Sequence, residues 1–277
     1  MAGVRWNFLS LGASILNRVN DVNRGNVHMS KWVTGKVVSL RQWTTDLYSI
    51  QVEADIAPFS AGQFNRLALE IDGEMVARPY SFVNGPDNNV HEFCFTVVKD
   101  GPLTHELIRL KAGDSLYLAP RAAGFFILSE VPQADTLWML STGTAIGPFL
   151  SILAMAEVWQ RFRNIVLVHA VRTAQELIYQ DEVQAFLADK PEQFRFIPFV
   201  SREDTNFAIK GRVPAAIEGG QLEQRAGLEI RPDNSQVMIC GNPAMVNDTQ
   251  HVLEARSLRK NRRREPGHIT TEQYWKA

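Results

Sequence analysis

One segment of the sequence combines glycines, hydroxyl groups and a proline in a pattern suited to holding a phosphate. It reads Ser141-Thr142-Gly143-Thr144-Ala145-Ile146-Gly147-Pro148, after an apolar stretch and before a helix-length segment. Gly143 and Gly147 allow the backbone to approach an anion, and the N–H groups and dipole of a following helix favour a pyrophosphate. The spacing departs from G-x-G-x-x-G, so an ordinary strand-to-helix turn remains the alternative.

Three arginines and a serine follow later apolar stretches and suit a second phosphate group. Arg172 and the pair Ser201-Arg202 each come directly after a stretch, and Arg212 lies in a glycine turn. In a dinucleotide-binding sheet an acid after the second strand accepts a ribose hydroxyl, whereas a 2′-phosphate needs cations. No acid stands there, so a clamp of charge-assisted bonds favours NADP(H) over NAD(H). Taken singly, each arginine is more typical of a solvated surface residue.

The first half of the chain carries a second pair of candidate motifs. Arg78-Pro79-Tyr80-Ser81 brings together a cation, a rigid turn, a ring and a hydroxyl at a strand start, and each of them could instead be structural. Asp100-Gly101-Pro102-Leu103-Thr104 precedes a short amphipathic segment, residues 105–110, whose N-terminus would accept an anion. Phosphate-receptive sites in both halves predict two nucleotide-like ligands.

A basic run, Arg256-Ser257-Leu258-Arg259-Lys260-Asn261-Arg262-Arg263-Arg264, contains no acid. It is typical of a solvated helix end, where cations offset the helix dipole. It is equally suited to docking an acidic electron carrier, because complementary potentials orient transient complexes. The formal net charge of −1 makes nucleic acid the weakest of the three interpretations.

The elements that must position these residues fall into two groups. Six short alternating stretches bounded by turn residues predict antiparallel strands in a small Greek-key β-barrel. They are residues 32–38, 47–52, 65–71, 75–83, 92–98 and 115–118.

After Val131-Pro132 the pattern changes to apolar strands separated by helix-length segments, which predicts a parallel α/β sheet covered on both faces. The expected strands are 136–141, 165–170, 194–200 and 236–240, and the expected helices are 149–162, 176–188 and 244–258. We therefore expect an extension at residues 1–28, a barrel domain at 29–130 and an α/β domain at 131–277.

Composition excludes several other classes of protein. The chain has 277 residues and only two cysteines, Cys94 and Cys240, without CxxC spacing, which excludes a disulfide scaffold, a structural zinc site and a cysteine-ligated iron–sulfur cluster. No apolar run reaches the roughly 20 residues of a membrane span, so a soluble cytoplasmic protein without a metal site is expected. Residues 1–28 carry three arginines and one acid, and we interpret them as a dispensable or mis-assigned extension, with a targeting arm as the alternative.

Taken together, the motifs resemble the bacterial ferredoxin or flavodoxin NADP reductases, which pair an FAD-binding Greek-key barrel with an NADP-binding α/β domain. The resemblance covers residues 31–275 and rests on motifs in the family's order. They are Ala61-Gly62-Gln63-Phe64, Arg78-Pro79-Tyr80-Ser81, Gly101-Pro102-Leu103-Thr104, Ala123-Gly124-Phe125-Phe126, Thr142-Gly143-Thr144-Ala145-Ile146-Gly147-Pro148, Val200-Ser201-Arg202-Glu203, Cys240-Gly241-Asn242-Pro243 and Tyr274-Trp275.

The resemblance also implies roles for individual residues. It implies FAD contacts from Arg78, Pro79, Tyr80, Ser81, Phe95, Thr96, Val97, Leu103, Thr104, Thr144 and Trp275. It implies NADP contacts from Gly143, Thr144, Arg172, Ser201, Arg202, Arg212, Gly241 and Asp248. Tyr80, Ser81 and Cys240 would lie at the reacting atoms, and Arg262, Arg263 and Arg264 would dock the carrier. Lys276-Ala277 follow Trp275, a departure from the family's usual end at this aromatic residue.

The activity implied is an FAD-dependent oxidoreductase, a monomer that exchanges electrons between NADPH and ferredoxin or flavodoxin. Hydride transfer between nicotinamide and flavin requires orientation, stacking and electrostatics from the protein. The rivals are an oxygenase-associated or free-flavin NAD(P)H reductase and a non-catalytic FAD-binding subunit. The cysteine count argues against an iron–sulfur domain of the kind that oxygenase reductases often carry.

Overall fold

The computed structural model describes residues 31–274, which belong to one compact unit. The predictions for residues 1–28, for Trp275 and for Lys276-Ala277 lie outside the described residues. Among residues 31–274, no helix combines the length and the apolar character of a membrane span.

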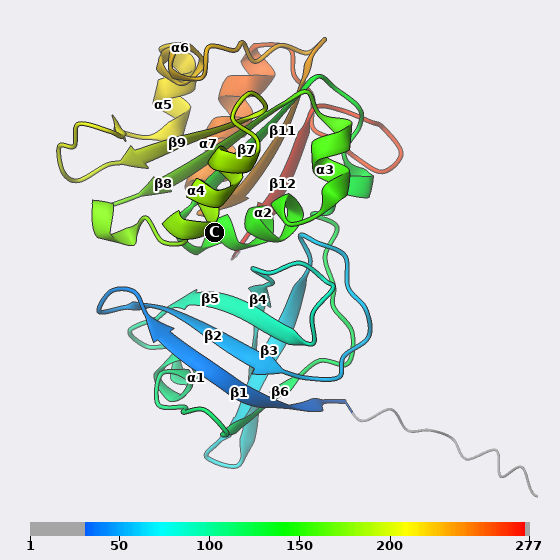
Figure 1. Ribbon diagram of the computed structural model, residues 1–277, viewed down its shortest axis with the longest axis vertical. Helices are drawn as coiled ribbons and strands as arrows, with labels where there is room; N and C mark the ends of the chain where they lie inside the picture. The colour runs from blue at the N-terminus through cyan, green and yellow to red at the C-terminus, as the bar shows by residue number, and fades with distance from the viewer. Residues whose placement is uncertain (1–30, 275–277) are drawn as a thin grey trace, which may run out of the picture. The chain divides into compact units, whose positions relative to one another are not determined.

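The first sheet is antiparallel and closes into a barrel, as the alternating stretches predict (Figure 1). Its strands, in the spatial order β4-β3-β6-β1-β2-β5, come from the part of the chain between residues 33 and 118. A bridge between Phe82 and Phe93 joins the two outer strands. They are β1 (Val33–Gln42), β2 (Leu47–Glu53), β3 (Phe64–Ile71), β4 (Glu74–Ser81), β5 (Val90–Thr96) and β6 (Ser115–Leu118).

The barrel core forms because alternate side chains of each strand point inward. Ile50 and Val52 of β2, Leu67 of β3 and Phe93 of β5 are fully buried there. Helix α1 (Pro102–Leu107) adds Leu103 and Leu107 to the same core.

The second sheet is parallel, with the order β10-β9-β8-β7-β11-β12. Its strands are β7 (Thr136–Thr142), β8 (Asn164–Val171), β9 (Phe194–Val200), β10 (Ile209–Lys210), β11 (Ser235–Gly241) and β12 (Ile269–Gln273). Its helices are α2 (Ile146–Leu153), α3 (Ala156–Arg161), α4 (Gln180–Asp189), α5 (Val213–Glu218), α6 (Gln221–Ala226) and α7 (Pro243–Ala255). Short 3-10 turns lie at Leu128–Glu130, Gly143–Ala145 and Ala174–Glu176.

Both faces of this sheet are buried because successive side chains of each strand enter opposite cores. On β7, Leu137 and Met139 pack with helices α2 to α4, whereas Trp138 and Leu140 pack with α5 to α7. The first of these cores continues into the barrel through Leu47, Val83 and Cys94. The two-domain architecture predicted from the sequence is therefore confirmed, and the domains share one apolar core.

Three predicted helices differ from the observed ones. The helix predicted at residues 149–162 begins earlier, with Pro148 in its first turn, and is interrupted where Met155 is extended. The indole of Trp159 donates to the carbonyl of Leu153 at 2.8 Å, which satisfies a group exposed by the break. The helix predicted at 176–188 begins only after Tyr179, whose backbone is left-handed, and the helix predicted at 244–258 ends at Ala255.

Two strands of the parallel sheet were not predicted, because both are short and lie at its edges. β10 has two residues, and β12 (Ile269–Gln273), beyond the basic run, has one apolar residue, Ile269, followed by four polar ones. β12 pairs with β11 so that Glu272 lies beside Cys240.

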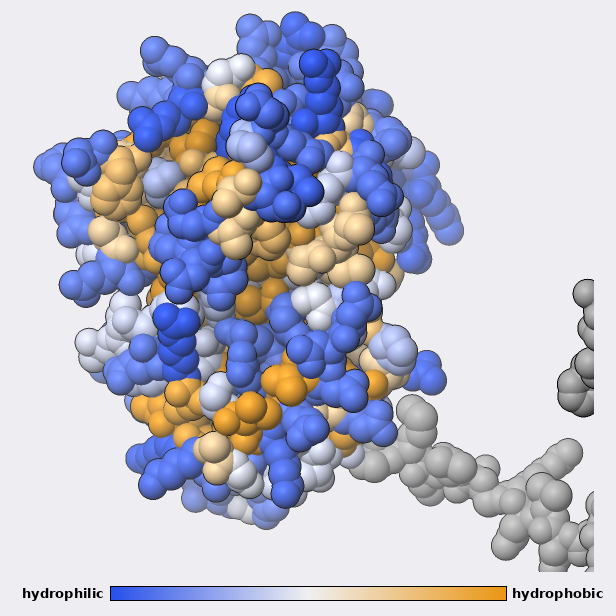
Figure 2. All heavy atoms as spheres, viewed as in Figure 1, coloured by the Kyte–Doolittle hydropathy of each residue, from blue (hydrophilic) through white to orange (hydrophobic). Residues whose placement is uncertain are grey.

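The visible surface mixes hydrophilic residues with small apolar areas (Figure 2). Phe125 is 67% exposed and is among the large apolar side chains at the surface. It follows Gly124, whose backbone φ of +111° is a conformation that favours glycine.

Candidate functional site

Tyr274 stands where the barrel and the parallel sheet meet. Its hydroxyl donates to the carbonyl oxygen of Thr144 at 3.2 Å, and its side chain interacts with Ser81 of the barrel and with Cys240 of β11. Burial raises the pKa of the Tyr274 phenol well above its usual value. A neutral hydroxyl therefore links the end of strand β4 to the glycine turn after β7.

Glu272 brings a carboxyl group to the same place. Burial raises its pKa to about 7, so near neutral pH this group exchanges a proton. Burial, with Glu272 nearby, raises the pKa of the Cys240 thiol well above its usual value. Cys240 is fully buried and stays a neutral thiol, which makes it a packing surface rather than a nucleophile.

The end of β4 places the predicted flavin residues in sequence along one strand. Arg78 and Pro79 are exposed, Tyr80 is partly buried and Ser81 is buried. Burial raises the pKa of Tyr80 to about 12, partly offset by the Arg78 guanidinium. Arg78 donates to the carbonyl of Ala77 at 2.8 Å, and its exposed guanidinium retains further donors for an anion.

The end of β5 lies close to Tyr80. The rings of Tyr80 and Phe95 are edge to face with centroids 6.0 Å apart, and the ring of Tyr48 is stacked with that of Phe95 at the same distance. Thr96 is exposed, and the amide of Val97 donates to the carbonyl of Asp46 at 2.7 Å. The structure thus brings the two barrel segments predicted to hold the flavin into contact.

The loop before α1 is held by the predicted residue Thr104. Its hydroxyl accepts from the amide of Val98 and donates to the carbonyl of Gly101, both at 3.1 Å. Leu103 is buried in the barrel core. Thr104 therefore shapes this loop with its side chain, and any contact with a phosphate falls to backbone N–H groups at the start of α1.

The glycine turn after β7 fits a closely approaching anion. Gly143 has φ +55°, and a Cβ added there would meet nothing within 4 Å, so its backbone faces open space. The fully buried His169 on β8 has Nε2 2.9 Å from the carbonyl of Gly143. Burial lowers the pKa of His169 to about 4, so near neutral pH the ring is uncharged and Nε2–H donates.

Gly241, at the end of β11, packs against this turn. A Cβ at Gly241 would lie 2.1 Å from the hydroxyl oxygen of Thr142, and φ there is +133°. That hydroxyl accepts from the amide of Asn242 at 2.9 Å, and Asn242 caps α7 through the amides of Ala244 and Met245. Gly241 is therefore required for the strand ends to approach one another.

The predicted phosphate clamp assembles at the carboxyl ends of β8 and β9. The amide of Arg202 donates to the carbonyl of Arg172 at 2.8 Å, and the amide of Ser201 donates to Val171 at 3.1 Å. Arg212 lies two residues beyond Lys210 of β10, which pairs with the last residue of β9. Three segments of the chain therefore share one edge, and the guanidinium groups of the three exposed arginines can face solvent.

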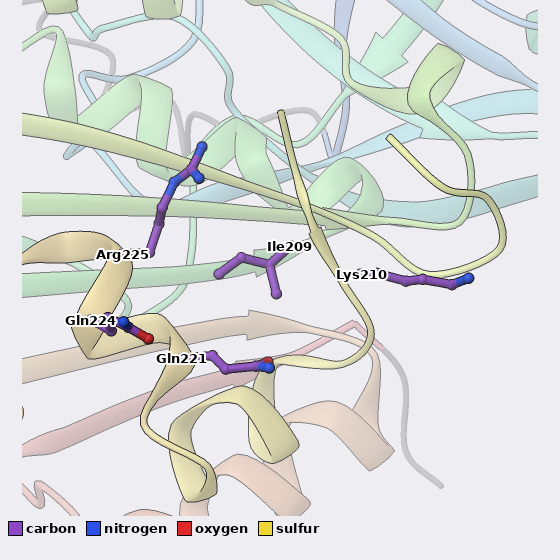
Figure 3. Close-up of a pocket in the computed structure, with 5 residues that line it drawn as sticks. All are labelled: Ile209, Lys210, Gln221, Gln224 and Arg225. Atoms are coloured by element: carbon purple, nitrogen blue, oxygen red, sulfur yellow. The ribbon is translucent and has the colours of Figure 1, made fainter. Parts of the chain in front are cut away.

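A shallow pocket lies beside this edge, between β10 and α6 (Figure 3). Its cations have internal partners: Lys210 pairs with Asp204 at 2.7 Å, and Arg225 donates to the carbonyl of Phe207 at 2.9 Å. These bonds fix the loop that carries Arg202. Asp248, the remaining predicted NADP residue, lies exposed on α7.

The basic run is a structured loop, so its interpretation as a helix end is wrong for Arg262, Arg263 and Arg264. Arg263 pairs with Glu130 at 3.2 Å and lies 4.7 Å from the ring centre of the exposed Phe125. Arg262 faces Glu265 at 3.8 Å across a turn. Earlier in the run, Arg256 pairs with Glu223 at 2.6 Å and serves the fold.

Two residues of the candidate site, Glu272 and His169, were missed from the sequence, and Tyr274 was named only as part of the motif that it forms with Trp275. The sequence carried no clear signal for Glu272, because only one residue of its strand, Ile269, is apolar. His169 is a polar residue inside the apolar stretch of β8, which signals a specific internal partner.

Comparisons with known proteins agree with this arrangement. The family model described as "Oxidoreductase NAD-binding domain" matches residues 139–251. A flavodoxin/ferredoxin–NADP reductase of Escherichia coli (strain K12) is 50% identical over 248 residues, covering 89% of this chain and all of that protein. A ferredoxin–NADP reductase of Azotobacter vinelandii is 34% identical over 255 residues, covering 88% of this chain and 98% of that protein.

Among solved structures, a ferredoxin NADP+ reductase from Neisseria gonorrhoeae with bound FAD and NADP aligns with a TM-score of 0.83 and 31% identity. The alignment covers 89% of this chain and all of that chain.

Proposed function

This chain belongs to the flavodoxin/ferredoxin–NADP reductase family, and from that premise we propose that it is an FAD-dependent oxidoreductase. It exchanges electrons between NADPH and a one-electron carrier, ferredoxin or flavodoxin. The observation that carries the proposal is the junction at Tyr274, where the barrel's Ser81 meets the Gly143-Thr144 turn and Cys240 of the parallel sheet.

The barrel residues fit FAD. Arg78 supplies an exposed cation, and the start of α1 has no side-chain cap, which leaves N–H donors for a pyrophosphate. Tyr80 offers a ring face beside Phe95, and Ser81 offers a hydroxyl at the junction. When bound, FAD supplies the conversion between hydride and single-electron transfer.

The parallel sheet suits NADP(H). The turn at Gly143 and Thr144 receives the pyrophosphate, and Arg172, Ser201, Arg202 and Arg212 receive the 2′-phosphate through charge-assisted bonds. Gly241 lets the backbone approach at the nicotinamide end, and Asp248 remains a proposed contact on α7.

The junction residues orient the reactants and hold a proton. Glu272, with a pKa of about 7, carries a proton on its carboxyl below neutral pH and gives it up above. Cys240 and Tyr274 stay neutral, so they limit water and charge around the reacting atoms. We place Trp275, next in sequence after Tyr274, against the FAD, as the resemblance implies.

The carrier would dock at the basic loop. Arg262 and Arg264 are exposed there, whereas Arg263 is partly neutralised by Glu130 and lies over the ring of Phe125, which stays 67% exposed. An acidic carrier matches this charge, with Phe125 as an apolar contact. A monomeric state and a cytoplasmic location stay proposals; two buried free thiols, Cys94 and Cys240, suit a reducing compartment.

Anaerobic titration with NADPH, followed through the visible absorption of the purified protein, tests the proposal. One equivalent of NADPH should bleach one bound FAD per chain, and oxidised ferredoxin or flavodoxin should then restore the absorption. FMN in place of FAD, or reduction by NADPH without transfer to either carrier, would overturn it. The latter result would favour a free-flavin reductase.

A further inference from the structure

Tyr179 occupies a backbone conformation that its side chain does not favour. It has φ +59° and ψ +33° at the start of α4, the left-handed region in which glycine and asparagine are most readily accommodated. It is nevertheless a large aromatic residue, only 2% exposed. Such a residue persists where its side chain makes contacts that outweigh the backbone cost.

Those contacts are with the barrel. The Tyr179 ring lies 4.9 Å from that of Trp43, centre to centre, in a tilted arrangement. Its hydroxyl donates to Oε1 of Glu92 on β5 at 2.7 Å. Gln51 on β2 donates to the other carboxylate oxygen at 3.1 Å, and the hydroxyl of Ser39 on β1 donates to Gln51 at 3.0 Å. Three barrel strands therefore hold the carboxylate that receives Tyr179.

A second cross-domain bond reaches the same part of the barrel. The hydroxyl of Ser151 on α2 donates to the carbonyl of Asn84 at 2.8 Å. The Asn84 side chain donates to the carbonyl of Val90 at 2.7 Å and accepts from the amide of Glu92 at 2.8 Å. Both bonds from the α/β domain thus converge on the first half of β5.

Strand β5 continues directly into the flavin segment. Glu92 lies three residues before Phe95, which contacts Tyr80. On the other side, Ser151 belongs to α2, the helix that follows the Gly143 turn. A shift at Tyr179 or Ser151 would therefore displace the pyrophosphate turn relative to β5.

We propose that Tyr179 is a positioning residue, whose hydrogen bond to Glu92 fixes the nicotinamide-binding domain against strand β5 at the distance and angle that hydride transfer requires. The inference rests on the proposed function. It assigns to the hydroxyl a role that the apolar packing of the ring does not supply. Phenylalanine would fill the same space, but without the hydroxyl Glu92 loses its partner from the other domain.

The first test is Tyr179→Phe in the FAD-loaded enzyme. Since small misplacements of reacting groups are costly, the rate of flavin reduction by NADPH should fall about tenfold in stopped-flow experiments. The dissociation constant of NADP+ and the FAD content should stay close to wild type, and Tm should fall by only the few degrees that loss of one hydrogen bond costs. The kinetic isotope effect with NADPH deuterated at nicotinamide C4 should rise, because hydride transfer becomes more fully rate-limiting.

Tyr117→Phe, which removes a hydroxyl from strand β6 of the barrel, is the matched control and should leave the reduction rate unchanged. If the Tm, the FAD content and the reduction rate of Tyr179→Phe all fall in proportion, Tyr179 has a purely structural role and the proposal is overturned. An unchanged reduction rate in Tyr179→Phe would also overturn it.

A double-mutant cycle isolates the bond. Glu92→Ala should slow flavin reduction as Tyr179→Phe does, and the double variant should be no slower than either single variant. Glu92→Gln retains an acceptor oxygen and should recover most of the rate. Additive losses would show that the two side chains act separately. Failure of NADPH to reduce the wild-type enzyme would instead refute the proposed function. That result differs from a failure of the positioning role, which shows only in the variants.

Discussion

Nε2 of His169 lies 2.9 Å from the carbonyl oxygen of Gly143, so a buried imidazole on β8 holds the glycine turn that follows β7. Its other nitrogen, Nδ1, has no hydrogen-bond partner within the described residues. Because a carbonyl can only accept, Nε2 must carry the hydrogen. A buried polar residue with one bond to the turn that we propose to bind phosphate fixes the direction in which the peptide groups of that turn point.

Replacement of His169 by Phe should therefore weaken the binding of NADPH and of NADH alike, since the pyrophosphate is common to both. Loss of one hydrogen bond of about 0.5–1.5 kcal/mol corresponds to about a two- to tenfold increase in dissociation constant. Calorimetric titration of each nucleotide measures it. His169→Gln retains an N–H donor and should recover part of the affinity.

Ser141→Ala is the control for this prediction, because the Ser141 hydroxyl donates to Val168 at 2.6 Å and not to the turn. It should alter stability more than nucleotide affinity. If His169→Phe lost affinity for NADPH but not for NADH, the role assigned to this residue would be contradicted.

The arginine clamp, unlike His169, predicts an effect on NADPH that NADH does not share. Arg202→Ala combined with Arg212→Ala should reduce kcat/KM for NADPH while leaving that for NADH nearly unchanged. Each charge-assisted bond is worth about 1.5–3 kcal/mol, which corresponds to about a 10- to 150-fold loss. Arg231→Ala removes a similarly exposed cation that pairs with Glu229 and Asp233, and should change neither value. Equal losses for both nucleotides would mean that the clamp is wrongly placed.

The raised pKa of Glu272 predicts that the free energy of unfolding depends on pH. Its folded pKa, about 7, lies above the unfolded value of about 4.3, so the native state retains a proton that the unfolded state has released. The contribution of this group is fully present below pH of about 4.3 and is lost as pH rises through 7. In urea unfolding at saturating FAD, the free energy of unfolding of Glu272→Gln should decline less than that of wild type between pH 5 and pH 8. The exposed Glu218→Gln should keep the wild-type slope. A wild-type slope in Glu272→Gln would mean that this carboxyl titrates at its ordinary pKa.

Local patterns predicted the fold because each sheet has a distinct spacing of apolar residues along its strands. Alternation in stretches such as residues 47–52 reflects one inward face of a barrel, and continuous apolar runs such as residues 165–170 reflect a sheet buried on both sides. Cations and glycines after these runs predicted the clamp and the turn, which stay proposals, because the carboxyl ends of parallel strands share one edge.

Contacts between distant segments could not be predicted in this way. Tyr274 and Glu272 reach the site only through β12, whose five residues carry a weak pattern and pair with β11 more than thirty positions earlier. The bond from Tyr179 to Glu92 spans 87 positions and depends on how two domains pack. Arg263 was predicted to lie at a solvated helix end or in a docking surface, and neither prediction included its pairing with Glu130, 133 positions away.

The basic loop sets the last prediction. Arg262→Glu combined with Arg264→Glu should slow electron transfer to ferredoxin or flavodoxin, while NADPH reduction of a small neutral dye stays nearly unchanged because the dye needs no docking. Added salt should slow the wild-type carrier reaction in the same way, since the screening length is about 8 Å at 0.15 M ionic strength. Lys36→Glu combined with Lys111→Glu makes the same change in net charge at exposed barrel positions and should have a smaller effect. If the loop variant harms the dye reaction equally, the loop supports the fold or the NADP site; if it harms neither reaction, the carrier docks elsewhere.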